Sequence, residues 1–139
     1  MDNTIQFNKW NTLKQTIQNN QTRHYIKEGC VYWVHIGQNI GCEVFGKQQD
    51  FRRPVLVLKR IYIPNYMDAF IGIPLTTKKL SGSSFTRLTN VKHNVVVTAM
   101  LGQIRAFDSR RTISYYYKAR KEEVDRVRNK LISFLSPSN

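Results

Sequence analysis

The sequence predicts a β-dominated α+β fold: a small, strongly bent antiparallel sheet or barrel, closed by a C-terminal helix and carrying an added N-terminal helix. Short apolar stretches rich in β-branched and aromatic residues follow one another along the middle of the chain, separated by turn-forming residues. No helical pattern falls between them, which argues against a parallel, doubly wound sheet. At 139 residues the chain fits one such domain with a hydrophobic core of its own.

An amphipathic helix of about three to four turns is expected near the N-terminus. Its apolar stripe recurs at helical spacing and consists of Phe7, Trp10, Leu13 (or Lys14 in its place) and Ile17. A polar connector begins at Gln18. The chain therefore divides into an N-terminal helical extension with its connector, residues 1–26, and a main domain, residues 27–139. We expect the stripe to pack on the main domain, with a partner-binding arm as the alternative.

The strands are expected wherever apolar, β-branched residues cluster. These stretches are Cys30–Ile36, Arg53–Leu58 (which Ile61–Pro64 extends or leaves as a turn), Ala69–Leu75, the hairpin of Ser84–Leu88 and Val95–Met100, and a short segment at Gln103–Asp108. Pro54 stands at the entry of its strand, where a missing N–H is tolerated.

The last element is expected to be a helix with one apolar face. That face consists of Val124, Val127, Leu131 and Phe134 or Leu135. Glu122, Glu123 and Asp125 lie in its first turns, where the helix dipole favours negative charge.

The charge balance indicates a polyanionic partner. Twenty-two Lys and Arg oppose nine Asp and Glu, which leaves a formal net charge of +13. Such a surplus attracts nucleic acid, although solubility or a ribosomal-type structural role would also explain it. No apolar run approaches the length of a membrane-spanning helix, so no membrane partner is expected. The polar N-terminus lacks the apolar core of a secretory signal and predicts a cytoplasmic protein.

The cysteines predict neither a disulfide framework nor a metal site. The two of them, Cys30 and Cys42, are too few for the first, and no pair has the spacing of metal ligands. We expect two buried or half-buried free thiols, and neither a metal nor another cofactor.

Arginines at strand ends and in loops are the strongest chemical signal in the residues themselves. They are Arg52, Arg53, Arg105, Arg110 and Arg111. A guanidinium holds phosphate through two parallel hydrogen bonds, and fixed guanidiniums stabilise the extra charge that develops during phosphodiester cleavage.

Hydroxyls and carboxylates near these arginines could complete such a site. Thr76 and Thr77 could donate to a phosphate oxygen, and Glu43 and Asp108 could act as general base or orient a guanidinium. Equally, Asp108 and Arg110 could form an ordinary surface ion pair.

Five ordered blocks of the sequence resemble the MazF/PemK toxins. The blocks are Gly29–Val34, Gly41–Glu43, Arg53–Leu58, Ile73–Thr77 and Gln103–Asp108, and the resemblance covers Lys27 to Leu135. The N-terminal segment Phe7–Asn11 resembles an extension found in one Gram-positive branch of that family.

The resemblance implies the plasmid-maintenance-toxin fold of MazF, CcdB and Kid, a twisted SH3-like antiparallel barrel with a terminal helix. It implies a homodimeric toxin of a type II toxin–antitoxin system, an mRNA interferase that cuts single-stranded RNA at short sequences without a metal. In such endoribonucleases the 2′-hydroxyl attacks the adjacent phosphate and leaves a 2′,3′-cyclic phosphate and a 5′-hydroxyl. The implied partners are single-stranded RNA and an acidic antitoxin, with DNA contacted only through the antitoxin complex.

Matching residue by residue, the resemblance implies five catalytic positions. Arg53 would transfer a proton or stabilise the phosphorane, and Thr76 would contact the scissile phosphate. Arg105 and Asp108 match positions with acid and base roles in some members, and Glu43 matches the base of others. Which of the two carboxylates acts as base stays open.

A second set is expected to bind RNA around these positions. It consists of Arg52, Thr77, Lys78, Gln103, Arg110 and Arg111. Two features depart from the family pattern: the loop between Glu43 and Arg53 is long, and Cys42 replaces a histidine that one branch uses in catalysis.

Two other function classes fit the same residues less well. One is a gyrase-inhibiting toxin like CcdB, and the other is a non-catalytic, basic RNA-binding module. The Arg-Pro block at Arg53 and the Gln-x-Arg-x-x-Asp block at Gln103 favour RNA cleavage, because a topoisomerase poison needs no phosphate-gripping arginines.

Overall fold

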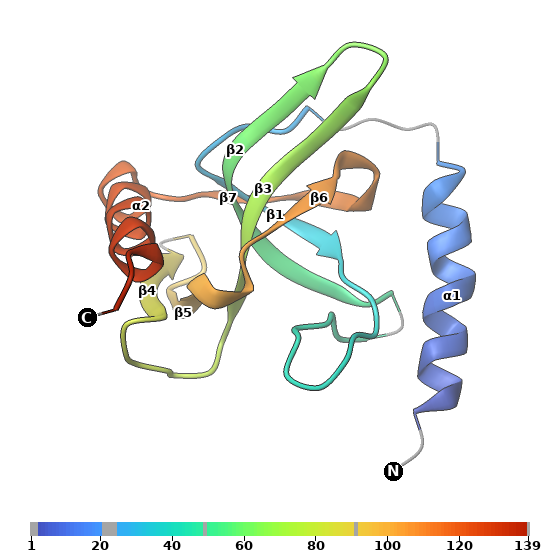
Figure 1. Cartoon of the computed structure of the whole chain (residues 1–139), viewed down its shortest axis with the longest axis horizontal. Helices are drawn as coiled ribbons and strands as arrows, with labels where there is room; N and C mark the ends of the chain where they lie inside the picture. The colour runs from blue at the N-terminus through green and yellow to red at the C-terminus, as the bar shows by residue number, and fades with distance from the viewer. Residues whose placement is uncertain (1–2, 21–24, 49, 91, 139) are drawn as a thin grey trace.

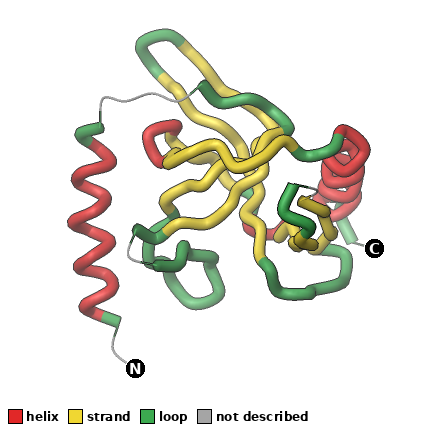
Figure 2. Tube along the Cα trace, turned by 180° about the vertical axis from the view of Figure 1, so that it is seen from behind, coloured by secondary structure: helices red, strands yellow, loops and turns green. Residues whose placement is uncertain are grey.

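The computed structural model describes residues 3–20, 25–48, 50–90 and 92–138. Its helices are α1 (Thr4–Gln18) and α2 (Lys121–Leu135), with short 3₁₀ turns at η1 (Leu101–Gln103) and η2 (Ser109–Arg111). Its strands are β1 (Cys30–His35), β2 (Arg52–Ile63), β3 (Met67–Thr76), β4 (Phe85–Asn90), β5 (Val95–Met100), β6 (Arg105–Asp108) and β7 (Thr112–Lys118). Figures 1 and 2 show the sheet in the middle, with α1 and α2 on opposite sides of it.

All strand pairs are antiparallel, and the seven strands form one bent sheet: six follow one another in the order β4-β5-β3-β2-β1-β7, and β6 pairs with β3 beside this path. β3 pairs with β2 along one edge. Its other edge is shared, because Leu75 and Thr76 pair with β5 whereas the 69–72 segment pairs with β6. This branching carries the chain from β5 through η1 into β6 while it stays beside β3. The predicted fold class, a bent antiparallel sheet with a helix at each end, is confirmed.

The element boundaries agree with the sequence in most places. β2 runs through to Ile63, so the first of the two alternatives for the Ile61 segment holds: it extends the strand. β7 was not predicted at all, although it pairs with β1 along one edge of the sheet. Its sequence, Thr-Ile-Ser-Tyr-Tyr-Tyr-Lys, is β-branched and aromatic but does not alternate cleanly between apolar and polar residues. The sequence pattern therefore does not predict a strand at these residues.

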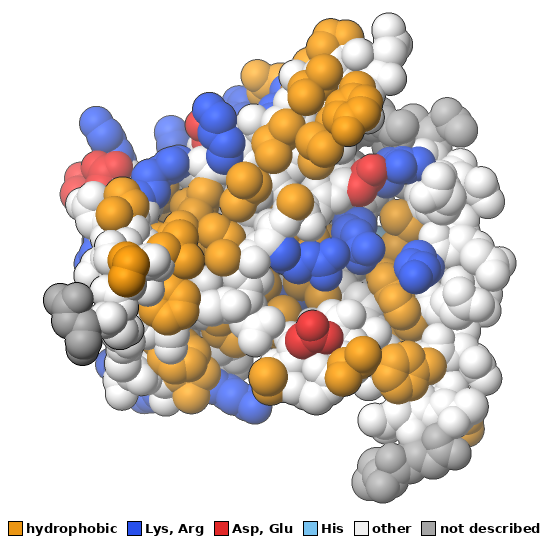
Figure 3. Space-filling view, viewed as in Figure 1, with side chains coloured by type: hydrophobic (Ala, Val, Ile, Leu, Met, Phe, Trp, Pro, Cys, Tyr) orange, Lys and Arg blue, Asp and Glu red, His pale blue; other side chains and the backbone are white. Residues whose placement is uncertain are grey.

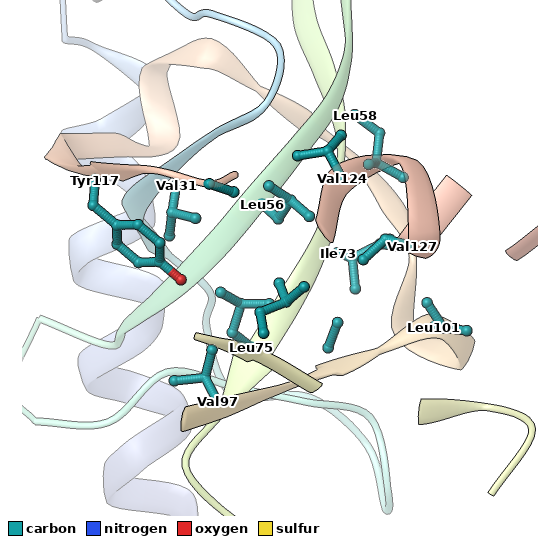
Figure 4. Close-up of a cluster of buried hydrophobic side chains, with 13 residues drawn as sticks. Val31, Leu56, Leu58, Ile73, Leu75, Val97, Leu101, Tyr117, Val124 and Val127 are labelled. Carbon is teal, nitrogen blue, oxygen red and sulfur yellow. The ribbon is translucent and has the colours of Figure 1, made fainter. Parts of the chain in front are cut away.

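Each face of the sheet has its own hydrophobic core. On one face α2 covers a cluster that includes Leu56, Ile73, Leu75, Val124 and Val127 (Figure 4). The predicted stripe of α2 is thus confirmed for Val124 and Val127, with Leu131 and Phe134 partly buried against the same cluster and Leu135 exposed.

The second core lies on the opposite face of the sheet. It includes Val55, Val57, Phe70 and Phe107, and the rings of Phe70 and Phe107 stack with their centroids 5.4 Å apart.

The N-terminal helix packs on the main domain through part of its expected stripe. Trp10 and Ile17 are buried with Phe51, and Leu13 is partly buried against them. Phe7 differs from the expectation, since 42% of it is exposed. The connector residues 21–24 lie outside the described part of the chain.

The two cysteines differ in their surroundings. Cys30 is buried, and burial raises the pKa of its thiol, whereas Cys42 is exposed. The expectation of a buried or half-buried thiol is therefore wrong for Cys42, which lies on an exposed loop. Neither of the helices in the described residues is long and apolar enough to cross a membrane.

Replacing Tyr117 by phenylalanine is expected to raise the free energy of unfolding by about 1 kcal/mol at neutral pH. The Tyr117 side chain points into the core (Figure 4), and its buried hydroxyl has no hydrogen-bond partner among the described residues. Burial also raises its pKa to about 12. Because the unfolded tyrosine loses its proton near pH 10, the parent protein should lose stability between about pH 10 and 12.

Urea denaturation of both proteins at pH 7 and at pH 11 would measure the two effects. The Tyr117→Phe variant lacks the ionisable hydroxyl, so the stability gap between the proteins should widen at pH 11. A phenylalanine variant that is less stable at pH 7 would show that the hydroxyl has a stabilising partner.

Candidate functional site

The site lies on the sheet face that carries the second core. Side chains two residues apart in a strand share a face, so Arg53 lies on the same face as Val55. Likewise Arg105 lies on the same face as Phe107, which packs with Val55. Two sequence-predicted arginines from different strands are therefore presented on one surface.

Arg53 and Thr76 face each other across β2 and β3. Val55 pairs with Pro74, and continuing that antiparallel register by two residues sets Arg53 opposite Thr76. The Arg53 side chain donates from Nη1 to the Leu75 carbonyl at 3.2 Å and from Nε to the Phe45 carbonyl at 2.9 Å. The guanidinium is thus held in place by backbone carbonyls, with no carboxylate neutralising it among the ion pairs of the described residues.

Burial changes the chemistry of this pair. It lowers the pKa of Arg53, because desolvation penalises the charged form. The guanidinium still keeps its proton at any working pH. Thr76 is only 7% exposed, and its hydroxyl accepts a hydrogen bond from the backbone N–H of Lys78 at 3.2 Å. A partly desolvated cation beside a fixed hydroxyl is suited to gripping a phosphate oxygen.

The guanidinium of Arg105 lies over the aromatic ring of Phe107. Arg105 pairs with Gly72 of β3, and its guanidinium carbon lies 4.7 Å from the centre of the Phe107 ring. Burial lowers the pKa of Arg105, and the negative charge of Glu43 acts in the opposite direction. Arg105 and Glu43 are therefore electrostatic neighbours although 62 positions separate them in the sequence.

The loop that carries Glu43 is fastened to the site at two points. Gln103 accepts a hydrogen bond from the Val44 N–H at 3.2 Å and donates to the Cys42 carbonyl at 3.3 Å. The Phe45 carbonyl accepts from Arg53, as described above. Gln103, which the sequence suggested as an RNA-binding residue, has both ends of its amide engaged with this loop. The long loop thus brings Glu43 near enough to Arg105 for its charge to act on the guanidinium.

Asp108 and Arg110 form an ion pair, which the sequence analysis gave as the alternative to a catalytic role for Asp108. Arg110 donates from Nε to Oδ1 at 2.9 Å and from Nη2 to Oδ2 at 2.8 Å, and its backbone N–H also donates to Oδ1. Both oxygens of Asp108 are therefore occupied. The pair holds the turn η2, and this turn positions Arg111 on the side of the site that faces α1.

Other predicted RNA-binding residues lie at the margins. Arg52 follows the opposite face from Arg53, where it pairs with Asp50 (Nε to Oδ2, 2.8 Å) and lies over the Trp33 ring. Thr77 and Lys78 are exposed just beyond the end of β3. Arg52 is thus the member of the predicted set that the structure does not bring to the face of Arg53.

The charge distribution of this face follows from that arrangement. Figure 3 shows basic side chains gathered across the middle of the face, between the sheet and α1, with few acidic ones nearby. Among the described residues, no three histidine, cysteine or acidic side chains come together as metal ligands. The positioned guanidiniums make this surface suited to binding an anion.

The sequence alone does not show that α1 lies beside Arg105 and Arg111. Asn11 and Lys14 of α1 line a cavity of about 330 Å³ together with Arg105 and Arg111. The sequence suggests Lys14 only as a possible member of the packing stripe. Its place seven residues after Phe7 does not indicate which surface the helix covers.

The comparisons with known proteins agree with this architecture. Residues 27–135 match the sequence profile of a family described as PemK-like, MazF-like toxin of type II toxin–antitoxin systems. No match was found among curated protein sequences.

Solved structures share the fold at low sequence identity. MazF from Deinococcus radiodurans is 23% identical and has a TM-score of 0.64, over 81% of this chain and 98% of its own. An endoribonuclease in complex with its cognate antitoxin, from a mycobacterial species, is 12% identical with a TM-score of 0.62, over 83% of this chain and all of its own. A MazE–MazF structure from Deinococcus radiodurans is 22% identical with a TM-score of 0.60, over the same shares of the two chains.

Proposed function

The chain belongs to the PemK-like, MazF-like toxins of type II toxin–antitoxin systems, and we propose that it is an endoribonuclease that cuts single-stranded RNA without a metal. The observation that carries the proposal is the reach of the Arg53 guanidinium to the Leu75 carbonyl, next to Thr76, with Arg105 on the same face. Such a set can hold the two non-bridging oxygens of one phosphate. The requirement for a 2′-hydroxyl would make RNA, and not DNA, the substrate.

The proposed chemistry is an internal transfer at phosphorus. The 2′-oxygen forms a bond to phosphorus and gives its proton to a general base, while the bond from phosphorus to the 5′-oxygen breaks. The products are a 2′,3′-cyclic phosphate and a 5′-hydroxyl, whose proton comes from solvent. Arg53 and Arg105 would stabilise the extra negative charge of the five-coordinate phosphorus, and Thr76 would orient the phosphate.

Glu43 is the better candidate for the base. Asp108 already accepts hydrogen bonds at both oxygens from Arg110, so taking a proton would cost it those bonds. Glu43 is exposed on the loop that is held by hydrogen bonds from Arg53 and Gln103. Among the described residues its Oε1 accepts one hydrogen bond, from the Ile40 N–H within the same loop at 3.0 Å. We propose Glu43 as base and Asp108 as the residue that positions η2.

The proposal is tested by incubating the purified protein with a long RNA in EDTA and mapping the new ends. The expected result is cutting at a short recurrent sequence, with 5′-hydroxyl ends that kinase can label directly. RNA that stays intact, or cutting that depends on added metal, would contradict the proposal.

We further propose that the protein forms a homodimer and that an acidic antitoxin inhibits it. The net charge of +13 favours an acidic partner, and two of the similar structures are complexes of a toxin with its antitoxin. A segment of that partner would lie over the arginines and compete with RNA.

Neutralising peripheral lysines is expected to weaken RNA binding without slowing the cut of bound RNA. A triple change of Lys78, Lys79 and Lys118 to glutamine removes three exposed charges. If each meets one phosphate, the slope of log affinity against log salt concentration should fall by about 2 for single-stranded RNA. Titrations at several salt concentrations measure the slope, and single-turnover cleavage at saturating protein measures the rate. A slower cut at saturation would contradict a purely steering role.

A further inference from the structure

The helix α1 lies beside the arginines of the site but outside residues 27–135, which the family match covers. Its position is set by close packing. The Trp10 ring lies 5.5 Å from that of Phe51, and a Cβ placed on Gly37 would come within 1.6 Å of the Trp10 indole. Only glycine lets the helix approach so closely, so α1 is seated on the main domain.

One face of α1 adjoins the site. Phe7, Asn11 and Lys14 follow at intervals of four and three residues, which puts them on the same side of the helix. With Arg105 and Arg111 they line the cavity of about 330 Å³, and no acidic residue is among its lining residues. Its volume falls in the range of cavities that hold small ligands, about 300 to 1,000 Å³.

The two guanidiniums in this cavity are held by contacts other than ion pairs within the described residues. Arg111 donates to the His35 carbonyl at 3.3 Å and lies 5.6 Å from the centre of the Trp10 ring. Neither Arg105 nor Arg111 takes part in an ion pair within the described residues. Burial lowers the pKa of both, and the charge of Arg105 lowers that of Arg111 further, while the negative charges of Glu43 and Asp108 act in the opposite direction on Arg105 and Arg111 respectively. An anion between them would relieve this repulsion.

The cavity continues along the helix. A second cavity of about 450 Å³ shares Trp10, Lys14 and Arg111 with the first and extends to Asn19 and to Arg110, whose ion-pair partner Asp108 also lines it. The two together form a groove between α1 and the turn η2. The two cavities, of about 330 and 450 Å³, offer more space than a single ion needs.

We propose that the Phe7, Asn11 and Lys14 face of α1 forms, with Arg105 and Arg111, a subsite for a nucleotide next to the scissile phosphate of single-stranded RNA. This rests on the proposed function. Phe7, 42% exposed, offers a ring on which a base can stack, the Asn11 amide can bond a base edge, and Lys14 can meet a phosphate. An acidic peptide would use only the cations, so the amide and the exposed ring favour a nucleotide. The helix would thus help to choose the cleavage sequence.

A matched pair of double variants tests this subsite. Asn11→Ala with Lys14→Ala removes an amide and a charge from the groove face. Asn8→Ala with Lys9→Ala removes the same two groups from exposed positions of the same helix that line neither cavity of the groove. Cleavage sites are mapped on a long RNA by sequencing the ends. Binding is measured separately with a single-stranded oligonucleotide whose 2′-hydroxyls are methylated, which cannot be cut by 2′-attack.

The groove variant is expected to bind the methylated oligonucleotide about tenfold more weakly, and to relax the base preference at one position beside the cut. The control should match the parent in both. An unchanged affinity and an unchanged cleavage sequence would overturn the subsite, as would a loss of antitoxin binding alone. If no protein cuts RNA but the affinity difference remains, the proposed cleavage fails and the subsite stands.

Discussion

Replacing Arg53 by alanine is expected to slow RNA cleavage by about a hundred- to a thousandfold, the usual cost of removing one fixed donor from a developing anion. The side chain is oriented by the carbonyls of Phe45 and Leu75 and stands opposite Thr76. Because many other basic side chains surround the site, the affinity for uncut RNA should change little. The loss should therefore appear in the rate at saturation and not in binding.

Two further variants separate the role of Arg53 from that of its charge. Arg87→Ala removes an exposed arginine on the edge strand β4 and should leave the cleavage rate near that of the parent. Arg53→Lys keeps the charge but loses the planar fork, and we expect it to recover only part of the rate. Full recovery with lysine would show that Arg53 acts as a simple point charge. A melting curve of Arg53→Ala close to that of the parent would exclude misfolding as the cause.

The fold could be predicted because local patterns encode it. The apolar clusters at β1, β2 and β3 are strong enough to identify strands without knowledge of their partners. β7 could have been found from the β-strand propensity of its tyrosines, but its apolar and polar residues do not alternate in the sequence. In the structure, too, Tyr117 is buried while Tyr115, two residues away, is exposed. Propensity without periodicity was too weak to separate a strand from a link.

The site could be predicted only in part, because its geometry depends on pairing. No spacing in the sequence sets Arg53 opposite Thr76; that follows from the register of β2 on β3. The resemblance to a family supplied those residues, whereas for α1 it indicated an extension without showing where the helix docks. The sequence showed that α1 had an apolar stripe, but where it would dock depends on Gly37 and Phe51, which lie far along the chain and carry no such signal.

The largest expected effect on stability comes from Phe107, which belongs both to the core and to the site. Phe107→Ala should lower the free energy of unfolding by about 3 to 5 kcal/mol, because the ring is 1% exposed and stacks on Phe70. Phe45→Ala is the matched control, since 40% of Phe45 is exposed, and it should cost under about 1 kcal/mol. Urea denaturation compares the two, and equal losses would contradict the assignment of Phe107 to the core.

A milder substitution of the same residue, Phe107→Leu, bears on catalysis through Arg105. The alternation of β6 sets Arg105 and Phe107 on one face, with the guanidinium 4.7 Å from the ring centre. Phe107→Leu should keep much of the buried volume but remove the aromatic support, worth about 0.5 to 2 kcal/mol. If that support positions Arg105, the leucine variant should cut RNA more slowly under conditions where it is fully folded. An unchanged rate in the folded leucine variant would mean that Arg105 is held by its hydrogen bond to the Ala106 carbonyl alone.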